Sequence, residues 1–311
     1  MSKRLLDLCA EDKKRFLDSF DYVLTDCDGV IWRVLGPIDG VGDAFKALKT
    51  HGKKIVCVSN NSVRETTDYM ERLRNLSPEV NVDDVIHPAV SVVRYLKSIN
   101  FQGPIYAIVS APFLAILQEA GFEVFTGPKE PLPETFREVM QAIANTKPAK
   151  AVIVDYDYNC NNPKLMKAEQ YLRADPECLF IAGAVDNKMS VSSSYSFFGP
   201  GRYVEILEKA TGRKATVLGK PSHLLGEQLK MQYSVGDARR VLFVGDMIDQ
   251  DVAFGKVAGF QTLLVLTGGT SKADLESLRD SEKVPDFYTE SFADFAQIVK
   301  DVLAKSKKAC L

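Results

Sequence analysis

The sequence has few of the residues that usually identify a metal or disulfide protein. It contains three histidines, at positions 51, 87 and 223, which are far apart and have no zinc-ligand spacing. Its six cysteines form no C-x-x-C pair and predict reduced thiols, not a disulfide framework. Any bound metal is therefore expected to have oxygen ligands, which favours Mg²⁺.

Charge and hydropathy exclude two further classes. The formal net charge is −2 and no basic block stands out, which argues against nucleic-acid binding as the main role. No run approaches 18 apolar residues, so no membrane span is expected. Residues 1–20 carry acidic side chains and lack a continuous apolar core. They predict an amphipathic helix rather than a signal peptide, and hence a cytoplasmic protein.

Short apolar runs alternate with amphipathic segments along the 311 residues, a length that suits one large or two moderate domains. The runs are continuous, not alternating with polar residues, as in strands buried on both faces. Such strand–helix alternation predicts an α/β fold with parallel sheets covered by helices. The predicted strands are 22–26, 54–59, 104–110, 151–155, 178–183, 215–219, 241–246 and 262–266.

Polar residues stand where four of these strands end. In open α/β sheets, ligands bind just beyond the carboxyl ends of the strands. We therefore expect these side chains to meet at one sheet edge. They are Asp26 and Asp28, then Ser59 with Asn60 and Asn61, then Lys220, and finally Asp246 with Asp249 and Asp251.

Asp26 and Asp28 lie in "VLTDCDGVIW", directly after an apolar run. Two carboxylates this close do not both stay ionised without a cation or a shared proton, and Mg²⁺ would relieve their repulsion. One carboxylate is then suited to nucleophilic attack and the other to proton transfer. A polar turn is the alternative. Alternation points Cys27 into the core, and a redox role for this residue is a weaker hypothesis.

The segment around Lys220, "VLGKPSH", is not a phosphate-binding P-loop. Pro221 follows the lysine, and Lys214 stands where the first glycine of that motif belongs. Lys220 is instead suited to neutralise phosphate charge directly. Ser59 and Asn60 would donate hydrogen bonds to phosphate oxygens, although a turn or a helix cap is an equal alternative.

The stretch "VLFVGDMIDQD" places three acidic residues after another buried strand. Asp246 is positioned for a metal, and Asp251 is positioned to bind that metal or to orient its water shell. Asp249 has either role or caps the following helix. Nucleophile, acid, hydrogen-bond donors, lysine and metal carboxylates together make up the parts needed for phosphoryl transfer.

These motifs resemble the haloacid dehalogenase-like (HAD) superfamily, in which D-x-D-G, a serine, a lysine and G-D-x-x-x-x-D follow in this order. The stretches "DCDGVIW", "VSNNS", "GKPS", "VGDMIDQD" and "LTGG" are most similar to the 4-nitrophenylphosphatase branch. That branch includes phosphoglycolate phosphatase and pyridoxal phosphate phosphatase. The resemblance spans nearly the whole chain.

The resemblance implies a role for each residue. Asp26 would attack phosphorus and become phosphorylated, and Asp28 would protonate the leaving alcohol and then activate water. Mg²⁺ would be held by Asp26, Asp246 and the backbone carbonyl of Asp28, with Asp251 in support. The transferring phosphoryl group would be held by Ser59, Asn60 and Lys220.

The resemblance also implies a Rossmann-like parallel-sheet core, 1–100 and 206–311, with a large inserted α/β cap of the C2 type at 101–205. The cap would determine substrate specificity and mediate a homodimer. Its sequence departs from the family pattern in two places. Asp155 stands where relatives usually carry glycine, and Asp186, expected to face the substrate, is preceded by Ala184 and Val185 in place of the usual polar pair.

The expected activity is therefore hydrolysis of a small phosphomonoester with Mg²⁺ as cofactor. Candidate substrates are 2-phosphoglycolate, pyridoxal phosphate or a similar metabolite, with 4-nitrophenyl phosphate as a test substrate. Two alternatives remain open. One is a phosphotransferase on the same fold, and the other is a catalytically silent binding protein.

Overall fold

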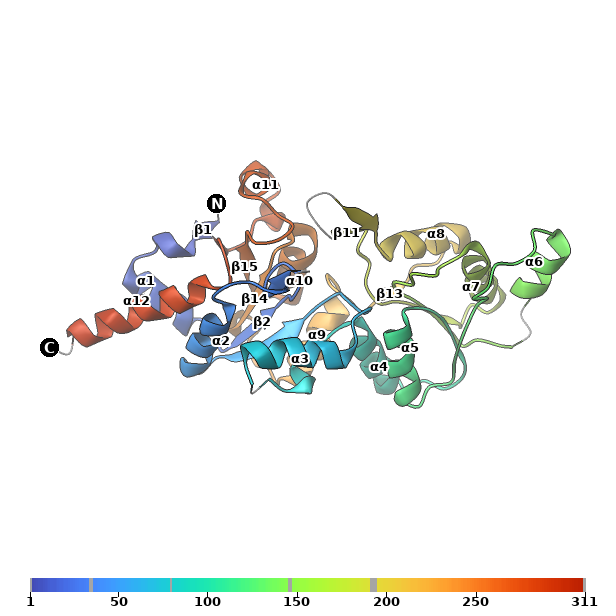
Figure 1. Ribbon diagram of the computed structural model, residues 1–311, viewed down its shortest axis with the longest axis horizontal. Helices are drawn as coiled ribbons and strands as arrows, with labels where there is room; N and C mark the ends of the chain where they lie inside the picture. Colours follow the sequence, from blue (N-terminus) through green and yellow to red (C-terminus); the bar gives the residue numbers. More distant parts are fainter. Residues whose placement is uncertain (1, 34–35, 79, 145–146, 191–194, 310–311) are drawn as a thin grey trace. The chain divides into compact units, whose positions relative to one another are not determined.

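The computed structural model describes residues 2–33, 36–78, 80–144, 147–190 and 195–309. The chain forms two compact units. The first contains the segments up to Ser59, Thr66–Ile86 and from Lys220 onwards, and the second contains Asn60–Glu65 and His87–Gly219. Each unit is built around its own parallel sheet (Figure 1), so the predicted α/β fold is confirmed. Among the described residues, no helix combines the length and apolar composition needed to cross a bilayer.

The sheet of the first unit is parallel throughout and has the order β1-β16-β15-β14-β2-β5-β6. Its central strands come from distant parts of the chain, since Val23 on β2 pairs with Leu242 on β14. The strands are β1 (Lys3–Arg4), β2 (Tyr22–Thr25), β5 (Lys54–Val58), β6 (Val85–Ile86), β14 (Val241–Gly245), β15 (Gln261–Val265) and β16 (Phe287–Thr289). A short antiparallel ribbon, β3 (Trp32–Arg33) with β4 (Gly36–Pro37), follows β2.

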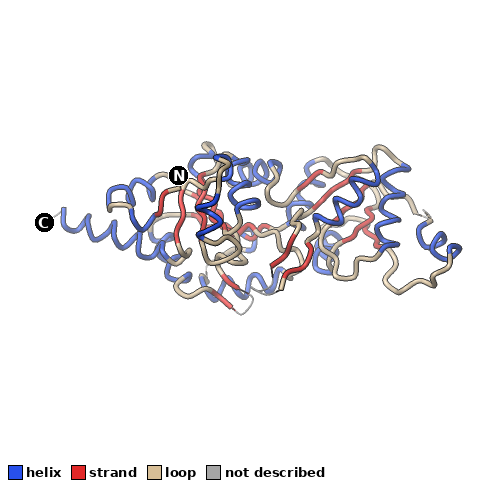
Figure 2. The backbone as a smooth tube through the Cα atoms, turned by 90° about the horizontal axis from the view of Figure 1, so that it is seen from above, coloured by secondary structure: helices blue, strands red, loops and turns tan. Residues whose placement is uncertain are grey.

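Helices cover both faces of this sheet, which explains why its strands are continuously apolar. Val23 packs with helices α1, α2 and α12, whereas Leu24, the next residue, packs with α9 and α10 on the other face. Figure 2 shows the strands enclosed between helices. The helices of this unit are α1 (Ala10–Asp18), α2 (Val41–Thr50), α3 (Thr66–Leu76), α9 (His223–Gln232), α10 (Ala253–Ala258), α11 (Lys272–Ser277) and α12 (Asp294–Ala309).

The second unit repeats this design with the parallel order β13-β10-β9-β7-β8. Val152 faces α7 and α8, and its neighbour Ile153 faces α4 and α5. The strands are β7 (Ile105–Ile108), β8 (Val124–Thr126), β9 (Ala151–Val154), β10 (Leu179–Ala182) and β13 (Thr216–Val217), with a separate hairpin of β11 (Lys188–Ser190) and β12 (Ser196–Phe198). The helices are α4 (Pro88–Ser98), α5 (Ala111–Glu119), α6 (Phe136–Ile143), α7 (Asn162–Ala174) and α8 (Gly201–Thr211).

Helix ends follow their local sequence signals. Ser222 caps α9 by accepting a hydrogen bond from the backbone N–H of Leu224 at 3.1 Å, and Ser110 does the same for α5. Gly52 and Gly121 both have positive φ angles just past α2 and α5. These positions favour glycine because it has no Cβ to clash in the left-handed region.

Two features of the fold differ from the sequence prediction. The first 20 residues do not form one helix, because Lys3–Arg4 pairs with β16 at the sheet edge and α1 begins only at Ala10. The second unit also extends beyond the inserted domain placed at 101–205. Helix α4 packs in the same apolar cluster as α5, and β13 pairs with β10, so both belong to this unit.

His87, directly before α4, predicts how stability depends on pH. The side chain is 1% exposed, and burial together with the charge of Arg94 lowers the pKa of His87 to about 4 from 6.5. The unfolded chain therefore binds more protons than the folded chain between these pH values. The neutral His87 therefore costs the protein no stability above pH 6.5. As the pH drops to 4, this one group lowers the free energy of unfolding by up to about 3 kcal/mol.

Urea unfolding of the wild type and His87→Gln at several pH values measures this contribution. The free energy of unfolding should fall more steeply with acidification in the wild type, because glutamine does not titrate. Parallel curves for the two proteins would contradict the assignment.

Candidate active site

The predicted site residues of the first unit lie at the carboxyl edge of its sheet. The backbone N–H of Asp26 donates to Val244 at 2.8 Å, and that of Ser59 donates to Ile86 at 2.9 Å. Both residues thus extend the strand ladder by one hydrogen bond before the chain turns. Because β14, β2 and β5 are neighbours, Asp246, Asp26 and Ser59 all leave the sheet at the same edge.

Lys220 connects two of the acidic residues. Its Nζ lies 2.9 Å from Asp26 Oδ1 and 2.7 Å from Asp251 Oδ1. The lysine is 1% exposed, and its ammonium group lies 5.5 Å from the centre of the Phe243 ring. A buried ammonium group is stable only when it is paired and hydrogen-bonded, and the two carboxylates meet that requirement.

The charges in this group do not balance. Asp26, Asp246 and Asp251 each place a carboxylate oxygen within 4.8 Å of the others, and Lys220 supplies one positive charge. Burial raises the pKa of Asp26 well above its ordinary value, although Lys220 opposes the shift. Burial and the charge of Asp251 raise the pKa of Asp246 to about 7. The ionised group therefore has excess negative charge in a low-dielectric environment, which a bound cation would neutralise.

Asp246 has the unsatisfied oxygen atom that such a cation requires. Its Oδ2 accepts a hydrogen bond from the backbone of Gly269 at 2.5 Å. Its Oδ1 is buried and has no hydrogen-bond partner among the residues that the structure describes. A buried oxygen of this kind is rare unless a ligand completes it. The donor set consists of carboxylate oxygens only, so it fits Mg²⁺.

Gly29 and Gly268 leave the space around Asp246. Gly29 has a φ of +85°, and a Cβ atom there would lie 2.7 Å from Asp246 Oδ2. A side chain on Gly268 would overlap the same carboxylate. Gly29 is therefore required by both its backbone conformation and the close approach of Asp246.

Asp251 supports the group from the π-helical turn Ile248–Val252. Its Oδ2 accepts from the backbone N–H groups of Asp246 at 3.0 Å and Met247 at 2.9 Å, and its Oδ1 contacts Lys220. Asp251 therefore links Lys220 to the backbone at Asp246 and Met247. Asp249, whose role was open, points elsewhere: its carboxylate pairs with Lys283 at 2.7 Å and is largely exposed.

Two aromatic residues position Asp28 and Ser59. The indole Nε1 of Trp32 donates to Asp28 Oδ1 at 2.9 Å, and the hydroxyl of Tyr69 donates to Ser59 Oγ at 3.1 Å. Trp32 and Tyr69 are buried with ring centres 6.0 Å apart. Trp32 therefore belongs to the hydrophobic core and fixes the Asp28 carboxylate by its hydrogen bond. Cys27 is buried in the same cluster.

Sequence reasoning missed these two roles. The only tryptophan of the chain lies three residues after the glycine of D-x-D-G, and that proximity was a usable signal for Trp32. Tyr69 gave none, because it lies in an amphipathic helix whose core positions are equally apolar. The loop after β15 was matched only as "LTGG", yet its Gly269 binds Asp246 and the hydroxyl of Thr267 donates to the carbonyl of Gly29.

The remaining predicted residues belong to the second unit. Asn60 Nδ2 donates to Asp186 Oδ2 at 2.8 Å. The structure thus brings together Asp26, Lys220, Asp246 and Asp251 in one unit, and Asn60 with Asp186 in the other.

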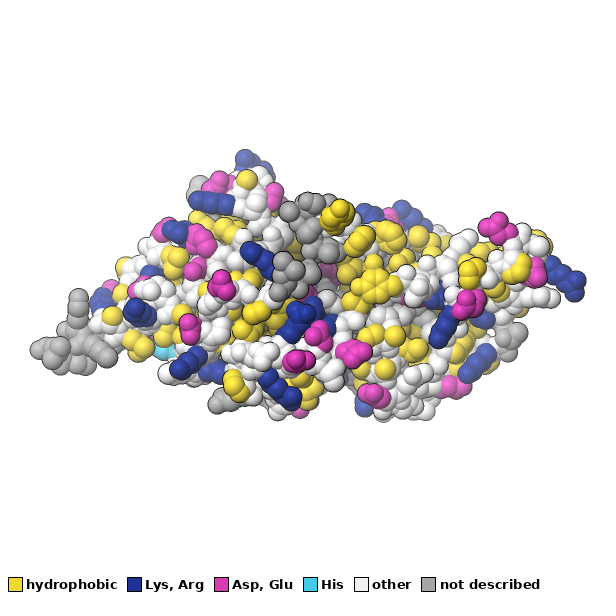
Figure 3. Space-filling view, in the orientation of Figure 1, with side chains coloured by type: hydrophobic (Ala, Val, Ile, Leu, Met, Phe, Trp, Pro, Cys, Tyr) yellow, Lys and Arg dark blue, Asp and Glu magenta, His cyan; other side chains and the backbone are white. Residues whose placement is uncertain are grey.

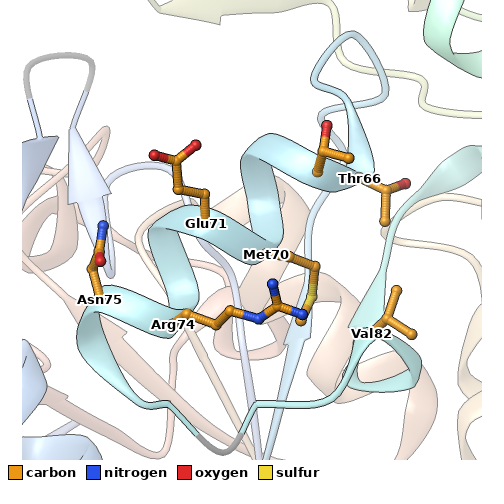
Figure 4. A pocket seen from close by; sticks show the side chains of 7 residues that line it. Thr66, Met70, Glu71, Arg74, Asn75 and Val82 are labelled. Carbon is orange, nitrogen blue, oxygen red and sulfur yellow. The ribbon is translucent and has the colours of Figure 1, made fainter.

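A separate hollow of about 620 Å³ lies along α3. Figure 4 shows Arg74 extending beside Met70 in this hollow, which contains none of the predicted site residues. On the face seen in Figure 3, acidic and basic side chains are interspersed, in line with the small net charge.

Comparisons with known proteins show the family of the chain. Residues 23–123 match the family model described as haloacid dehalogenase-like hydrolase, and residues 217–295 match a HAD-hydrolase-like model. Phosphoglycolate phosphatase 2 of Arabidopsis thaliana is 34% identical over 94% of this chain and 98% of its own length. The chain belongs to the haloacid dehalogenase-like hydrolases.

Further relatives of this haloacid dehalogenase-like chain are also phosphatases. Glycerol-3-phosphate phosphatase of Rattus norvegicus is 32% identical over 94% of each chain. The solved structure of p-nitrophenyl phosphatase from Archaeoglobus fulgidus superposes with a TM-score of 0.75 and 28% identity, over 90% of this chain and 99% of that one. The chain is accordingly a phosphoric monoester hydrolase of the HAD type.

The crowded carboxylates predict a metal response that depends on Asp246. In the wild type, Mg²⁺ at 100 times its Kd should raise the free energy of unfolding by about 2.7 kcal/mol. Asp246→Asn removes one buried charge and one expected metal ligand. This variant should be at least as stable as the wild type in EDTA and should lose the stabilisation by Mg²⁺.

Asp249→Asn is the matched control, since Asp249 lies three residues from Asp246 but pairs with Lys283 at the surface. It should keep the full response to Mg²⁺ in thermal unfolding. A response that survives in Asp246→Asn, or disappears in Asp249→Asn, would contradict the assigned metal position.

Proposed function

We propose that this protein is a Mg²⁺-dependent phosphatase that hydrolyses small phosphomonoesters through a phosphorylated Asp26. The observation that carries the proposal is the ion pair between Asp26 and the buried Lys220, next to Asp246 and Asp251. A carboxylate held in this way is oriented before substrate binds. Aspartate in such a site is a known type of nucleophile for phosphoryl groups.

In the first step, a carboxylate oxygen of Asp26 attacks phosphorus. A bond forms between that oxygen and phosphorus, and the bond from phosphorus to the leaving oxygen breaks. Asp28 donates its proton to this oxygen, so the leaving group departs as a neutral alcohol. The hydrogen bond from Trp32 keeps the Asp28 carboxyl group in one orientation.

In the second step, water attacks the phosphorus of phosphorylated Asp26. Asp28, now ionised, accepts a proton from that water as the new oxygen–phosphorus bond forms. The bond from phosphorus to the Asp26 oxygen breaks, which releases inorganic phosphate and restores both carboxyl groups. Asp28 returns to its starting protonation state over the two steps, because it first donates a proton and then accepts one.

The transferring phosphoryl group is proposed to bind Ser59, Asn60 and Lys220. The Lys220 ammonium balances negative charge on the phosphoryl oxygens, and the Ser59 hydroxyl, oriented by Tyr69, donates a hydrogen bond. Because the neighbouring carboxylates raise the pKa of Lys220 above its ordinary value despite its burial, the lysine stays charged.

Mg²⁺ is proposed to be held by Asp26, Asp246 and the backbone carbonyl of Asp28, with Asp251 in support. When bound, it supplies positive charge that screens the nucleophile from the phosphate and stabilises charge on the phosphoryl oxygens. The unpartnered Oδ1 of Asp246 supports this position. Asp251 fixes the Asp246 backbone and Lys220 simultaneously.

The proposed substrates are small phosphorylated metabolites, among them 2-phosphoglycolate, glycerol 3-phosphate and pyridoxal phosphate. The names of relatives that span nearly the whole chain support this class. The second unit is proposed to be the cap that selects the substrate, with Asp186 facing it. A homodimer through this unit and a cytoplasmic location remain predictions.

Release of nitrophenol from 4-nitrophenyl phosphate tests the proposed function. Turnover should require Mg²⁺, stop in EDTA and return when Mg²⁺ is restored. Asp26→Asn should lower kcat by at least ~10³-fold because it removes the nucleophile. Asp28→Asn should lower kcat by about 10²–10⁴-fold because it removes the proton donor.

Asp249→Asn, with its exposed carboxylate, is the control and should retain wild-type turnover. Free phosphate should equal nitrophenol in amount, whereas transfer of the phosphoryl group to an added alcohol would indicate the phosphotransferase. Well-folded protein without turnover would refute the proposed function, and an active Asp26→Asn variant would refute the nucleophile.

A further inference from the structure

Asp155 is a buried carboxylate that the proposed reaction does not use. It follows β9 at the carboxyl edge of the second sheet and is completely inaccessible to solvent. Burial raises the pKa of Asp155 to about 6, opposed by the hydrogen bonds that it accepts, so the group is ionised at neutral pH. No cationic side chain pairs with it in the described part of the chain, and a buried charge of this kind needs a structural reason.

Three hydrogen-bond donors surround this carboxylate. Oδ1 accepts from the hydroxyl of Ser62 and from the backbone N–H of Tyr156 at 2.6 Å, and Oδ2 accepts from the backbone N–H of Ala184 at 2.7 Å. Ser62 makes a second hydrogen bond, in which its backbone carbonyl accepts from the hydroxyl of Ser110 at 2.8 Å. Asp155 thus joins the segment Asn60–Glu65 to the ends of β9 and β10.

The sequence also provides the space that this carboxylate occupies. A Cβ atom on Gly183 would overlap the Asp155 carboxyl group, so the glycine after β10 makes room for it. Asp155 stands where the resemblance leads us to expect glycine. The chain therefore has its own buried network at this point of the fold.

Two segments attached to this network lead directly into the proposed phosphate-binding residues. Segment Asn60–Glu65 begins one residue after Ser59, at the point where the chain passes from the first unit to the second. On the other side, the carbonyl of Gly183 accepts from the backbone N–H of Gly219 at 2.8 Å, and Gly219 immediately precedes Lys220.

The two segments are also packed closely together within the second unit. A Cβ atom added to Gly219 would lie 3.0 Å from Asn60 Oδ1 and 2.7 Å from the carbonyl oxygen of Gly183. Neither contact leaves room for a side chain. A shift of one segment is therefore transmitted to the other through this contact and through the Asp155 carboxylate.

We propose that Asp155 is a positioning residue that fixes the two chain segments leading into Ser59 and Lys220. It acts through Ser62 on the first segment and through the turn Gly183–Ala184 on the second. This inference rests on the proposed function, in which Ser59 and Lys220 hold the phosphoryl group. Displacement of such groups by a fraction of an ångström weakens binding of the transition state more than binding of the substrate.

Steady-state kinetics with 4-nitrophenyl phosphate test the proposal in Asp155→Asn and Ser62→Ala. Each variant should lower kcat by about tenfold with less than a threefold change in KM, since the displaced groups act mainly in the transition state. The double variant should be no worse than Asp155→Asn alone, because both changes break the same connection.

Asp157→Asn is the matched control. Asp157 lies two residues further on and is also buried, but its carboxylate pairs with Lys164 on α7 at 2.7 Å. It should keep kcat within twofold of the wild type even if its stability falls. A kcat for Asp155→Asn and Ser62→Ala equal to that of Asp157→Asn would overturn the proposal.

Hydrogen exchange provides a readout that does not depend on activity. Peptides covering 60–65 and 217–222 should exchange faster in Asp155→Asn and Ser62→Ala than in the wild type, and at the wild-type rate in Asp157→Asn. If the wild type proved inactive, this pattern alone would support the role of Asp155 while the proposed function failed. Unchanged exchange in both peptides would overturn the inference.

Discussion

The central constraint in this molecule is the burial of one ammonium group among three carboxylates. Lys220 contacts Asp26 and Asp251 directly, and Asp246 lies against the same group. Removing one partner of a buried ion pair costs about 3–5 kcal/mol, because the other charge is then left without compensation. The group is also too negative by itself. Further positive charge, which Mg²⁺ would supply in the proposed reaction, would relieve this repulsion.

The fold serves this group by bringing distant parts of the chain to one edge. Neighbouring parallel strands end together, and the backbone of Asp26 is fixed to Val244 by a hydrogen bond beyond the last strand residue. Glycine at position 29 allows the Asp246 carboxylate to lie close to the backbone of the turn. The buried Trp32 donates a hydrogen bond to Asp28 and so fixes its carboxylate. Each support acts through the backbone or through a buried aromatic side chain, and the site is accordingly rigid before substrate binds.

Much of this arrangement could be predicted from the sequence. Continuous apolar strands indicated the parallel sheets, and the polar residues that end them indicated the site edge, because both signals arise from local sequence. The strands β1, β6, β8 and β16 of the two parallel sheets were missed, since two or three residues carry no periodicity. Tyr69 and Asp155 were not identified as supports either. Their importance arises from contacts with residues distant in the sequence, Ser59 for Tyr69 and Ser62 for Asp155.

In the proposed reaction Asp26 becomes covalently phosphorylated, and chemical trapping can detect this intermediate. Protein that is turning over 4-nitrophenyl phosphate with Mg²⁺ is quenched in acid and treated with borohydride, which reduces an acyl phosphate to an alcohol. Peptide mass spectrometry then locates the reduced side chain. Reduction is expected at Asp26 and at no other carboxylate of the group. Reduction at Asp28 or Asp246, or none during steady turnover, would contradict this expectation.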